Sequence, residues 1–464
     1  MNTNREILRL AVPSILANIT IPLVGIVDTA IVGHISDASA IGGIAVGTML
    51  FDLLYWNFGF LRIGTSGLTA QAYGSNNRAE CLSLLRQSVF VALAAAAAVW
   101  LVQWVFVSVV LMLVPCSGHV ADIAREYFYI RIWAAPATLT LMAFKGWFIG
   151  MQDTRSPMAI DILVNVVNMA ASYLLAVNAG LGVAGVAWGT LIAQYGGLLL
   201  AIVFFVVKYQ SPTTIHSFTR SYLASARTII APVRHYNWRD YFRFNGNLFV
   251  RSLCFMVVYV GFTSLAGGFG DTELAVSSII MKLFMFFSYF VDGFAYAGEA
   301  LVGRAFGELK ANGQMDERRM CRDDISTVNC QLSTVVRLLF CWSMGVGIVF
   351  TIVYGIWGDN CIALLTNDAE VVAGAGKYMG WLVAMPIIST LAFMWDGVYT
   401  GAVAGVQIRN AMIWAAVAFV VAYMATHQWA GAQALYIAYF AHLAARVLYL
   451  TINWKKTYEL SKIR

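Results

Sequence analysis

Charged side chains are scarce in this sequence. Asp, Glu, Lys and Arg make up 12% of the 464 residues, whereas 60% are hydrophobic. Soluble domains carry about 25% charged residues, so the composition argues against a soluble protein. The seven cysteines form no CxxC pair and the six histidines are dispersed, so neither a disulfide framework nor a metal site is expected. No DDxxD-like aspartate cluster is present, which argues against a magnesium-dependent membrane enzyme such as a prenyltransferase.

Long apolar runs are abundant instead. A helix needs about 20 residues to cross the hydrocarbon core of a bilayer. The sequence therefore predicts an all-α polytopic membrane protein with twelve transmembrane helices, at 7–33, 41–71, 83–114, 122–149, 157–178, 183–207, 241–266, 274–303, 328–356, 371–402, 409–426 and 430–453. The first run is too long for the apolar region of a signal peptide and no small-residue cleavage site follows it, so we expect a retained helix.

Basic residues alternate along the chain. Of the 30 Lys and Arg residues, 21 lie in the segments 1–9, 72–86, 150–156, 208–243, 304–322, 403–409 and 454–464. The intervening loops carry none, so the positive-inside rule places both termini in the cytoplasm. The net charge of +6 is then a signal of topology, and no nucleic-acid partner is expected.

An internal repeat divides the chain. "GHISDASAIGGIAVGTMLFDLLYWNFGF" from Gly33 aligns with "GGFGDTELAVSSIIMKLFMFFSYFVDGF" from Gly267, and the register continues, after a slip of one residue, to Gly74 and Gly307. We expect an N-lobe of six helices at 1–210, a cytoplasmic connection at 211–240 and a C-lobe of six helices at 241–464. Because six is even, the repeats are parallel, and two such bundles can open a central cleft to each side in turn.

Asp28 is the ionisable residue that stands out in the apolar spans. It lies about five residues, roughly 8 Å, inside the outer end of the first helix, so its short side chain cannot easily reach water. It aligns with Gly261 or Phe262 in the repeat, so the charge is not duplicated. A buried carboxylate can take up a proton near neutral pH, or hold sodium if other oxygens surround it.

The second half carries its own acids. Glu299 aligns with Thr65 or Ser66, so it is also unduplicated. With Asp396 it forms either a second acidic site, neutralised by Arg251 or Lys282, or a structural ion pair. For other charged residues within the spans, structural roles are favoured: Asp161 lies just inside its helix start, and Arg131, Lys282 and Arg446 can snorkel or pair.

Four motifs resemble one known family. These are "P…VDTAIVGH" in the first helix, "FGFLRIGTSGLTAQAYG" (58–74), "GEALVGRAFG" (298–307) and "WDGVYTGAVAGVQIRNAM" (395–412). They are similar to the MATE (multidrug and toxic compound extrusion) transporters, specifically the DinF branch, across nearly the whole chain. The resemblance implies V-shaped N and C lobes and cation-coupled efflux by alternating access, with no enzymatic activity.

The resemblance also implies roles for particular residues. Asp28 corresponds to the coupling aspartate of the first helix, and Asn168, Ser172 and Thr190 to its N-lobe partners. Ser172 replaces the second aspartate of the family's NxxxD motif, which favours coupling to protons over sodium. In this hypothesis protonation of Asp28 bends the first helix at the hinge Pro22 and expels the substrate.

The resemblance further implies a multi-pass protein of the bacterial cytoplasmic (inner) membrane that works as a monomer in the lipid bilayer. Its substrates would be small organic cations or amphipathic toxic compounds, and it would need no cofactor beyond H⁺, or Na⁺ as the less favoured ion. One alternative is a flippase of the same superfamily that moves lipid-linked saccharides, for which a strongly cationic cleft is expected. A non-transporting receptor or scaffold is the alternative from another class.

Overall fold

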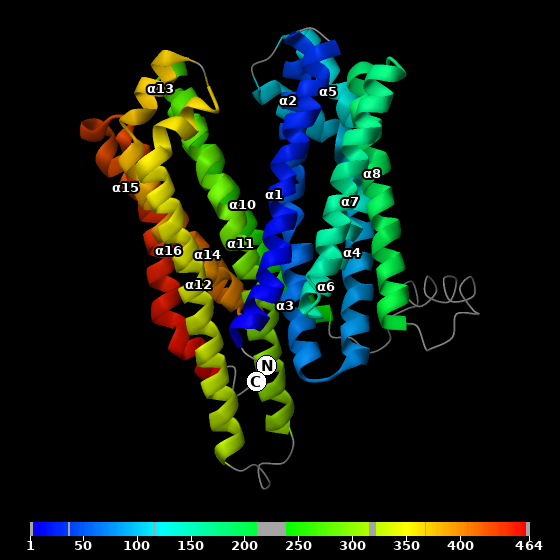
Figure 1. Ribbon diagram of the computed structural model, residues 1–464, viewed down its shortest axis with the longest axis vertical. Coiled ribbons are helices and arrows are strands. Elements are labelled where there is room, and N and C mark those ends of the chain that lie inside the picture. The colour runs from blue at the N-terminus through cyan, green and yellow to red at the C-terminus, as the bar shows by residue number, and fades with distance from the viewer. Residues whose placement is uncertain are drawn as a thin grey trace.

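The computed structural model describes residues 3–35, 38–114, 117–210, 238–314, 322–366 and 368–460. These residues form helices and turns, with no strand among them (Figure 1). Twelve helical segments within this described part are long and apolar enough to cross a membrane. The twelve spans predicted from the sequence are therefore confirmed in number and order.

The first half contains eight α-helices, and short 3-10 turns join two pairs of them into single spans. These helices are α1 (Thr3–Ile35), α2 (Ala38–Trp56), α3 (Phe60–Gly74), α4 (Arg78–Leu113), α5 (Gly118–Arg131), α6 (Ala135–Gly150), α7 (Arg155–Tyr173) and α8 (Gly182–Phe205). The turns are Asn57–Gly59 between α2 and α3, and Ile132–Ala134 between α5 and α6. One π-helical turn, Leu174–Asn178, follows α7 and another, Val206–Gln210, follows α8.

The second half begins at Trp238, so the predicted connection at 211–240 lies almost wholly outside the described residues. Its helices are α10 (Trp238–Gly267), α11 (Asp271–Gln314), α12 (Arg322–Ala363), α13 (Ala369–Gly376), α14 (Met379–Gly401), α15 (Gly405–Ala430) and α16 (Gln433–Leu460). The single span expected at 371–402 is wrong in its first part, because α13 ends at Gly376 and Tyr378 leaves the helical conformation. Glycines at 374, 376 and 380 weaken a helix there.

The two halves repeat the same turn. Gln152, after α6, and Val403, after α14, both have positive φ, at 63° and 53°. The hydrogen bonds match as well, since Asp153 N donates to Phe148 O and Ala404 N donates to Tyr399 O. A non-glycine residue with positive φ is uncommon, so its recurrence at matching places supports the parallel repeat.

Glycines let matching helix pairs approach closely in each half. A Cβ at Gly150 of α6 would lie 2.7 Å from the carbonyl oxygen of Ser66 on α3. A Cβ at Gly401 of α14 would lie 2.9 Å from the carbonyl oxygen of Glu299 on α11. These equivalent contacts align Glu299 with Ser66 rather than Thr65.

The halves meet at the end of the molecule that holds both termini and diverge toward α2 and α13, which gives a V-shaped outline (Figure 1). Side chains cross the junction: Gln71 donates to the carbonyl of Gly401 (3.0 Å), and Gln152 to that of Ala300 (2.7 Å). Glu6 of α1 and Arg304 of α11 form an ion pair at 2.6 Å. Helix α1 is thereby tied to the second half over its first turns.

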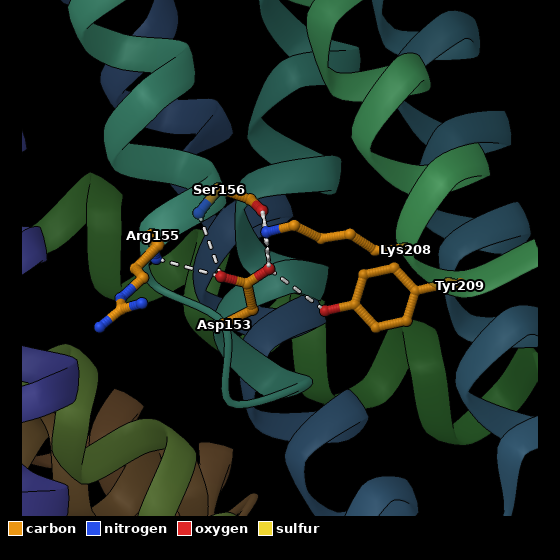
Figure 2. A network of polar contacts seen from close by, with 5 residues as sticks. All are labelled: Asp153, Arg155, Ser156, Lys208 and Tyr209. Carbon is orange, nitrogen blue, oxygen red and sulfur yellow. Dashed lines mark hydrogen bonds and ion pairs between the residues drawn. The ribbon is translucent and has the colours of Figure 1, made fainter.

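A polar network fixes the beginning of α7 to the end of α8 (Figure 2). One carboxylate oxygen of Asp153 accepts hydrogen bonds from the backbone N–H groups of Arg155 and Ser156, both at 3.1 Å. The other accepts from Lys208 Nζ (2.9 Å), from Tyr209 OH (3.3 Å) and from the Ser156 hydroxyl (2.6 Å). Asp153 thus satisfies exposed N–H groups at the start of α7 and anchors the chain just before the connection between the halves.

Candidate functional site in the first half

Close packing of α7 on α8 builds the wall of the candidate site. A Cβ at Gly189 would lie 2.5 Å from the backbone nitrogen of Ser172, and one at Gly185 would lie 2.5 Å from that of Ala176. Small residues at helix contacts in membranes allow such backbone approach. The glycines of "GVAGVAWGT" therefore bring the polar face of α7 against α8.

Two of the predicted residues bond directly across this contact. Asn168 Nδ2 donates to Thr190 Oγ1 at 2.8 Å, and Thr190 in turn donates to the carbonyl of Val186 at 3.2 Å. Both side chains are buried. Asn168 Oδ1 is buried and accepts no hydrogen bond from the described residues.

Asp28 of α1 completes the site. It faces Ser172, which lies one helical turn beyond Asn168 on α7. It is 8% exposed, and its carboxylate interacts with the hydroxyl of Ser172. Its Oδ1 is buried and has no hydrogen-bond partner in the described part of the chain. Buried polar atoms are almost always paired, so two oxygens without partners mark a place where a proton or a small ligand can bind.

Arg131 is the residue of this site whose role the sequence did not assign. Its charge interacts with those of Asp28 and Asp52. Its guanidinium donates to Tyr127 OH at 2.7 Å and lies 4.6 Å from the centre of the Phe51 ring, so it is held inside the lobe and does not snorkel. The cost of an arginine in an apolar span was the signal that could have pointed to it.

The acids predicted in the second half are held by separate arginines. Asp396 of α14 pairs with Arg251 of α10 at 2.5 Å and with Arg446 of α16. Arg446 is 1% exposed, so this is a buried cluster of one carboxylate and two guanidinium groups. Lys282, the other cation considered for Asp396, is exposed.

Glu299 pairs with a residue of the first half. Its carboxylate lies 3.3 Å from an amino group of Arg62 on α3 and interacts with the hydroxyl of Ser66. Glu299 thus forms one ion pair and Asp396 forms two. Arg251 was predicted as a partner, whereas Arg62 of α3 and Arg446 of α16 were not assigned to these acids from the sequence.

Pro22, the predicted hinge, lies within an unbroken α1. Below it, Asn18 donates to the carbonyl of Tyr289 on α11 at 3.2 Å. Thr20, also before the proline, accepts from Asn165 of α7, and Asp28, after the proline, interacts with Ser172. Helix α1 therefore contacts α11 of the second half before the proline, and α7 of the first half on both sides of it.

Comparison with known proteins places this arrangement in a family. A family model described as MatE matches residues 13–174. The DNA damage-inducible protein F of Escherichia coli (strain K12) is 32% identical over 459 residues, which cover 98% of this chain and 93% of that protein. This chain belongs to the MATE family. The multidrug and toxin extrusion protein 1 of Danio rerio is also similar, at 24% identity over 88% of this chain and 63% of that protein.

Solved MATE structures show the same fold. A MATE crystal structure in the bent conformation has a TM-score of 0.82 at 16% identity and covers 99% of this chain and 97% of that one. A MOP superfamily transporter from Pyrococcus furiosus has a TM-score of 0.81 at 15% identity, over 99% and 96%. As a MATE protein the chain is a membrane transporter of the multidrug efflux class, and its DinF-type relationship follows from the E. coli protein.

Proposed function

We propose that this MATE protein is an antiporter that exports small organic cations or amphipathic toxic compounds in exchange for protons taken up at Asp28. The observation that carries the proposal is the buried Asp28 Oδ1, which lacks a hydrogen-bond partner among the described residues. A carboxylate in this state gains most from binding a proton or a cation, and it can exchange one for the other.

The oxygens around Asp28 favour the proton over sodium. A hard metal cation needs several oxygen ligands. Here the Thr190 hydroxyl already accepts from Asn168 and donates to Val186, and Ser172 supplies no second charge.

Helix α1 supplies the mechanical link in this proposal. Its first turns are bound to α11 through Glu6 and Asn18, whereas Asp28 faces α7. Loss of the charge on Asp28 weakens its attraction to Arg131 and releases the outer part of α1. A bend at Pro22, where the helix lacks one backbone hydrogen bond, lets that part move while the first turns stay fixed.

The proposal includes the orientation and setting expected from the sequence. In this proposal the termini, and so the closed end of the V, lie in the cytoplasm of a bacterial cell, as the basic segments predict, and the protein is a monomer in the inner membrane. The flippase alternative, with its strongly cationic cleft, receives less support, because Arg62, Arg251 and Arg446 are each ion-paired with a carboxylate.

Ethidium efflux from proteoliposomes tests the proposal, with proton and sodium gradients imposed separately. We expect the wild type to respond to the proton gradient and Asp28→Asn to lose coupled efflux while keeping its expression and thermal stability. Retained proton-driven efflux in Asp28→Asn would overturn the proposal.

A companion variant tests the choice of ion. Ser172→Asp restores a second carboxylate beside Asp28, so we expect it to gain sodium-driven efflux that the wild type lacks. Sodium-driven efflux by the wild type would replace the proton with sodium in the proposal. The matched control Ser333→Asp lies on α12, away from α7, and should leave ion selectivity unchanged.

A further inference from the structure

One face of α11 carries a set of side chains that the Asp28 site does not use. Asp292, Tyr296 and Glu299 are spaced as i, i+4 and i+7, so they lie on one side of the helix. None has an equivalent in the first repeat, where Phe58 aligns with Asp292, Arg62 or Ile63 with Tyr296, and Ser66 with Glu299. An aromatic ring flanked by carboxylates is a chemical environment that suits an organic cation.

This face already holds a cation that belongs to the protein. The guanidinium carbon of Arg62 lies 4.1 Å from the centre of the Tyr296 ring, and one of its nitrogens lies 3.3 Å from Glu299 Oε2. The first distance is well within the range of a cation–π contact. Arg62 belongs to α3 in the first half of the chain, so this contact bridges the two halves.

Arg62 leaves part of the face unused. A single nitrogen contacts a single oxygen of Glu299 in this ion pair, and the Arg62 side chain is 20% exposed. Asp292 has no ion-pair partner within 4 Å in the described part of the chain, although its charge interacts with those of Arg62 and Arg251. An arginine held by both oxygens of a carboxylate would be harder to displace.

We propose that the Asp292–Tyr296–Glu299 face is a second binding site for organic cations, and that Arg62 is a tethered competitor that occupies it in the conformation described. Planar cations with delocalised charge, such as guanidinium and aromatic ammonium ions, are the ligands it would take. Separation of α3 from α11 withdraws Arg62 and opens the site, and its return expels the ligand. The inference rests on the proposed function for the direction of transport, whereas binding itself can be tested alone.

Equilibrium binding of ethidium to the purified protein in lipid nanodiscs, without any ion gradient, tests this inference. We expect Arg62→Ala to bind ethidium about tenfold more tightly than the wild type, because the competitor is gone and the ring and carboxylates remain. Ethylguanidinium should displace that ethidium. In the double variant Arg62→Ala/Glu299→Gln the gain should disappear.

Controls separate this site from a purely structural ion pair. Lys208→Ala removes the cation of the Lys208–Asp153 pair, which lies within the first half, and should produce no gain. Equal or weaker ethidium binding in folded Arg62→Ala, or a gain that survives Glu299→Gln, would overturn the inference. If Arg62→Ala fails to fold, Tyr296→Leu in the wild-type background provides the test. We expect it to weaken ethidium binding several-fold. An unchanged affinity for ethidium would refute the site.

The proposed coupling at Asp28 can be tested separately from the binding site on α11. Asp28→Asn in the Arg62→Ala background should keep the gain in ethidium binding, because the site on α11 does not include Asp28. Loss of coupled efflux with retained binding would leave both ideas in place. Proton-driven efflux that survives Asp28→Asn would overturn only the coupling proposal.

Discussion

Gly74 and Gly307, which the sequence repeat aligns, pack against each other in the structure. A Cβ at Gly74 would lie 2.0 Å from the carbonyl oxygen of Arg304, and a Cβ at Gly307 would lie 2.0 Å from that of Gln71. The contact is reciprocal, as expected where an approximate two-fold axis passes between equivalent helices. The closed end of the V is therefore built from the same residues of both repeats, and it has no room for a side chain.

Alanine at either glycine should damage this closed end. We expect Gly74→Ala and Gly307→Ala each to lower the free energy of unfolding by about 1–3 kcal/mol and to reduce ethidium efflux, because the added methyl group forces the backbones of α3 and α11 apart. Thermal unfolding and efflux from proteoliposomes measure the two effects.

Gly196→Ala on α8 is the matched control, since a Cβ there meets no atom within 4 Å. It should behave as the wild type. Normal stability in Gly74→Ala would show that the junction is looser than the structure indicates.

The sequence predicted the parts of the protein that follow from local pattern. Twelve apolar runs and the repeat indicated the fold, and the resemblance to the MATE family assigned Asn168, Ser172 and Thr190 to one site with Asp28. Among the partners of Glu299 and Asp396, Arg251 was predicted but Arg62 and Arg446 were not, because ion pairs between distant spans leave no periodic pattern in the sequence. No periodicity in the sequence indicates that Arg62 reaches Glu299.

The buried position of Asp396 gives a test between its two interpretations. Removing its charge leaves Arg251 and the fully buried Arg446 without their carboxylate. If the cluster is structural, Asp396→Asn should lower the free energy of unfolding by about 3–5 kcal/mol, which thermal or denaturant unfolding would detect.

Asp122→Asn provides the comparison, because the Arg125–Asp122 pair is exposed and should contribute at most about 1 kcal/mol. Asp396→Asn with normal stability but altered coupling would instead identify a functional acid.

The network around Asp153 predicts a dependence of stability on pH. Burial opposes ionisation of this carboxyl group, but hydrogen bonds from Ser156 and Lys208 outweigh it and hold the pKa of Asp153 below its ordinary value of about 4. The stabilisation is therefore present above pH 4 and is lost as the pH falls through the lower pKa of the folded state.

Asp153→Asn should reduce the stability at pH 7 by about 0.5–2 kcal/mol, since an amide supplies only one acceptor oxygen for these donors. The difference in unfolding temperature between the wild type and this variant should shrink below pH 4. A difference that stays constant from pH 7 to pH 3 would contradict the assignment of the stabilisation to the ionised carboxylate.

The position of Pro22 predicts a defect in turnover rather than in binding. Alanine restores an N–H group that can donate to the carbonyl of Asn18, which stiffens α1 between its contacts with α11 and the Asp28 site. We expect Pro22→Ala to lower the maximal rate of ethidium efflux about tenfold while leaving KM nearly unchanged, because binding does not require the bend. Pro13→Ala is the control within the same helix, in the part bound to α11, and should transport like the wild type. An equal loss of rate in both variants would show that the stiffness of α1 as a whole, rather than a hinge at Pro22, limits transport.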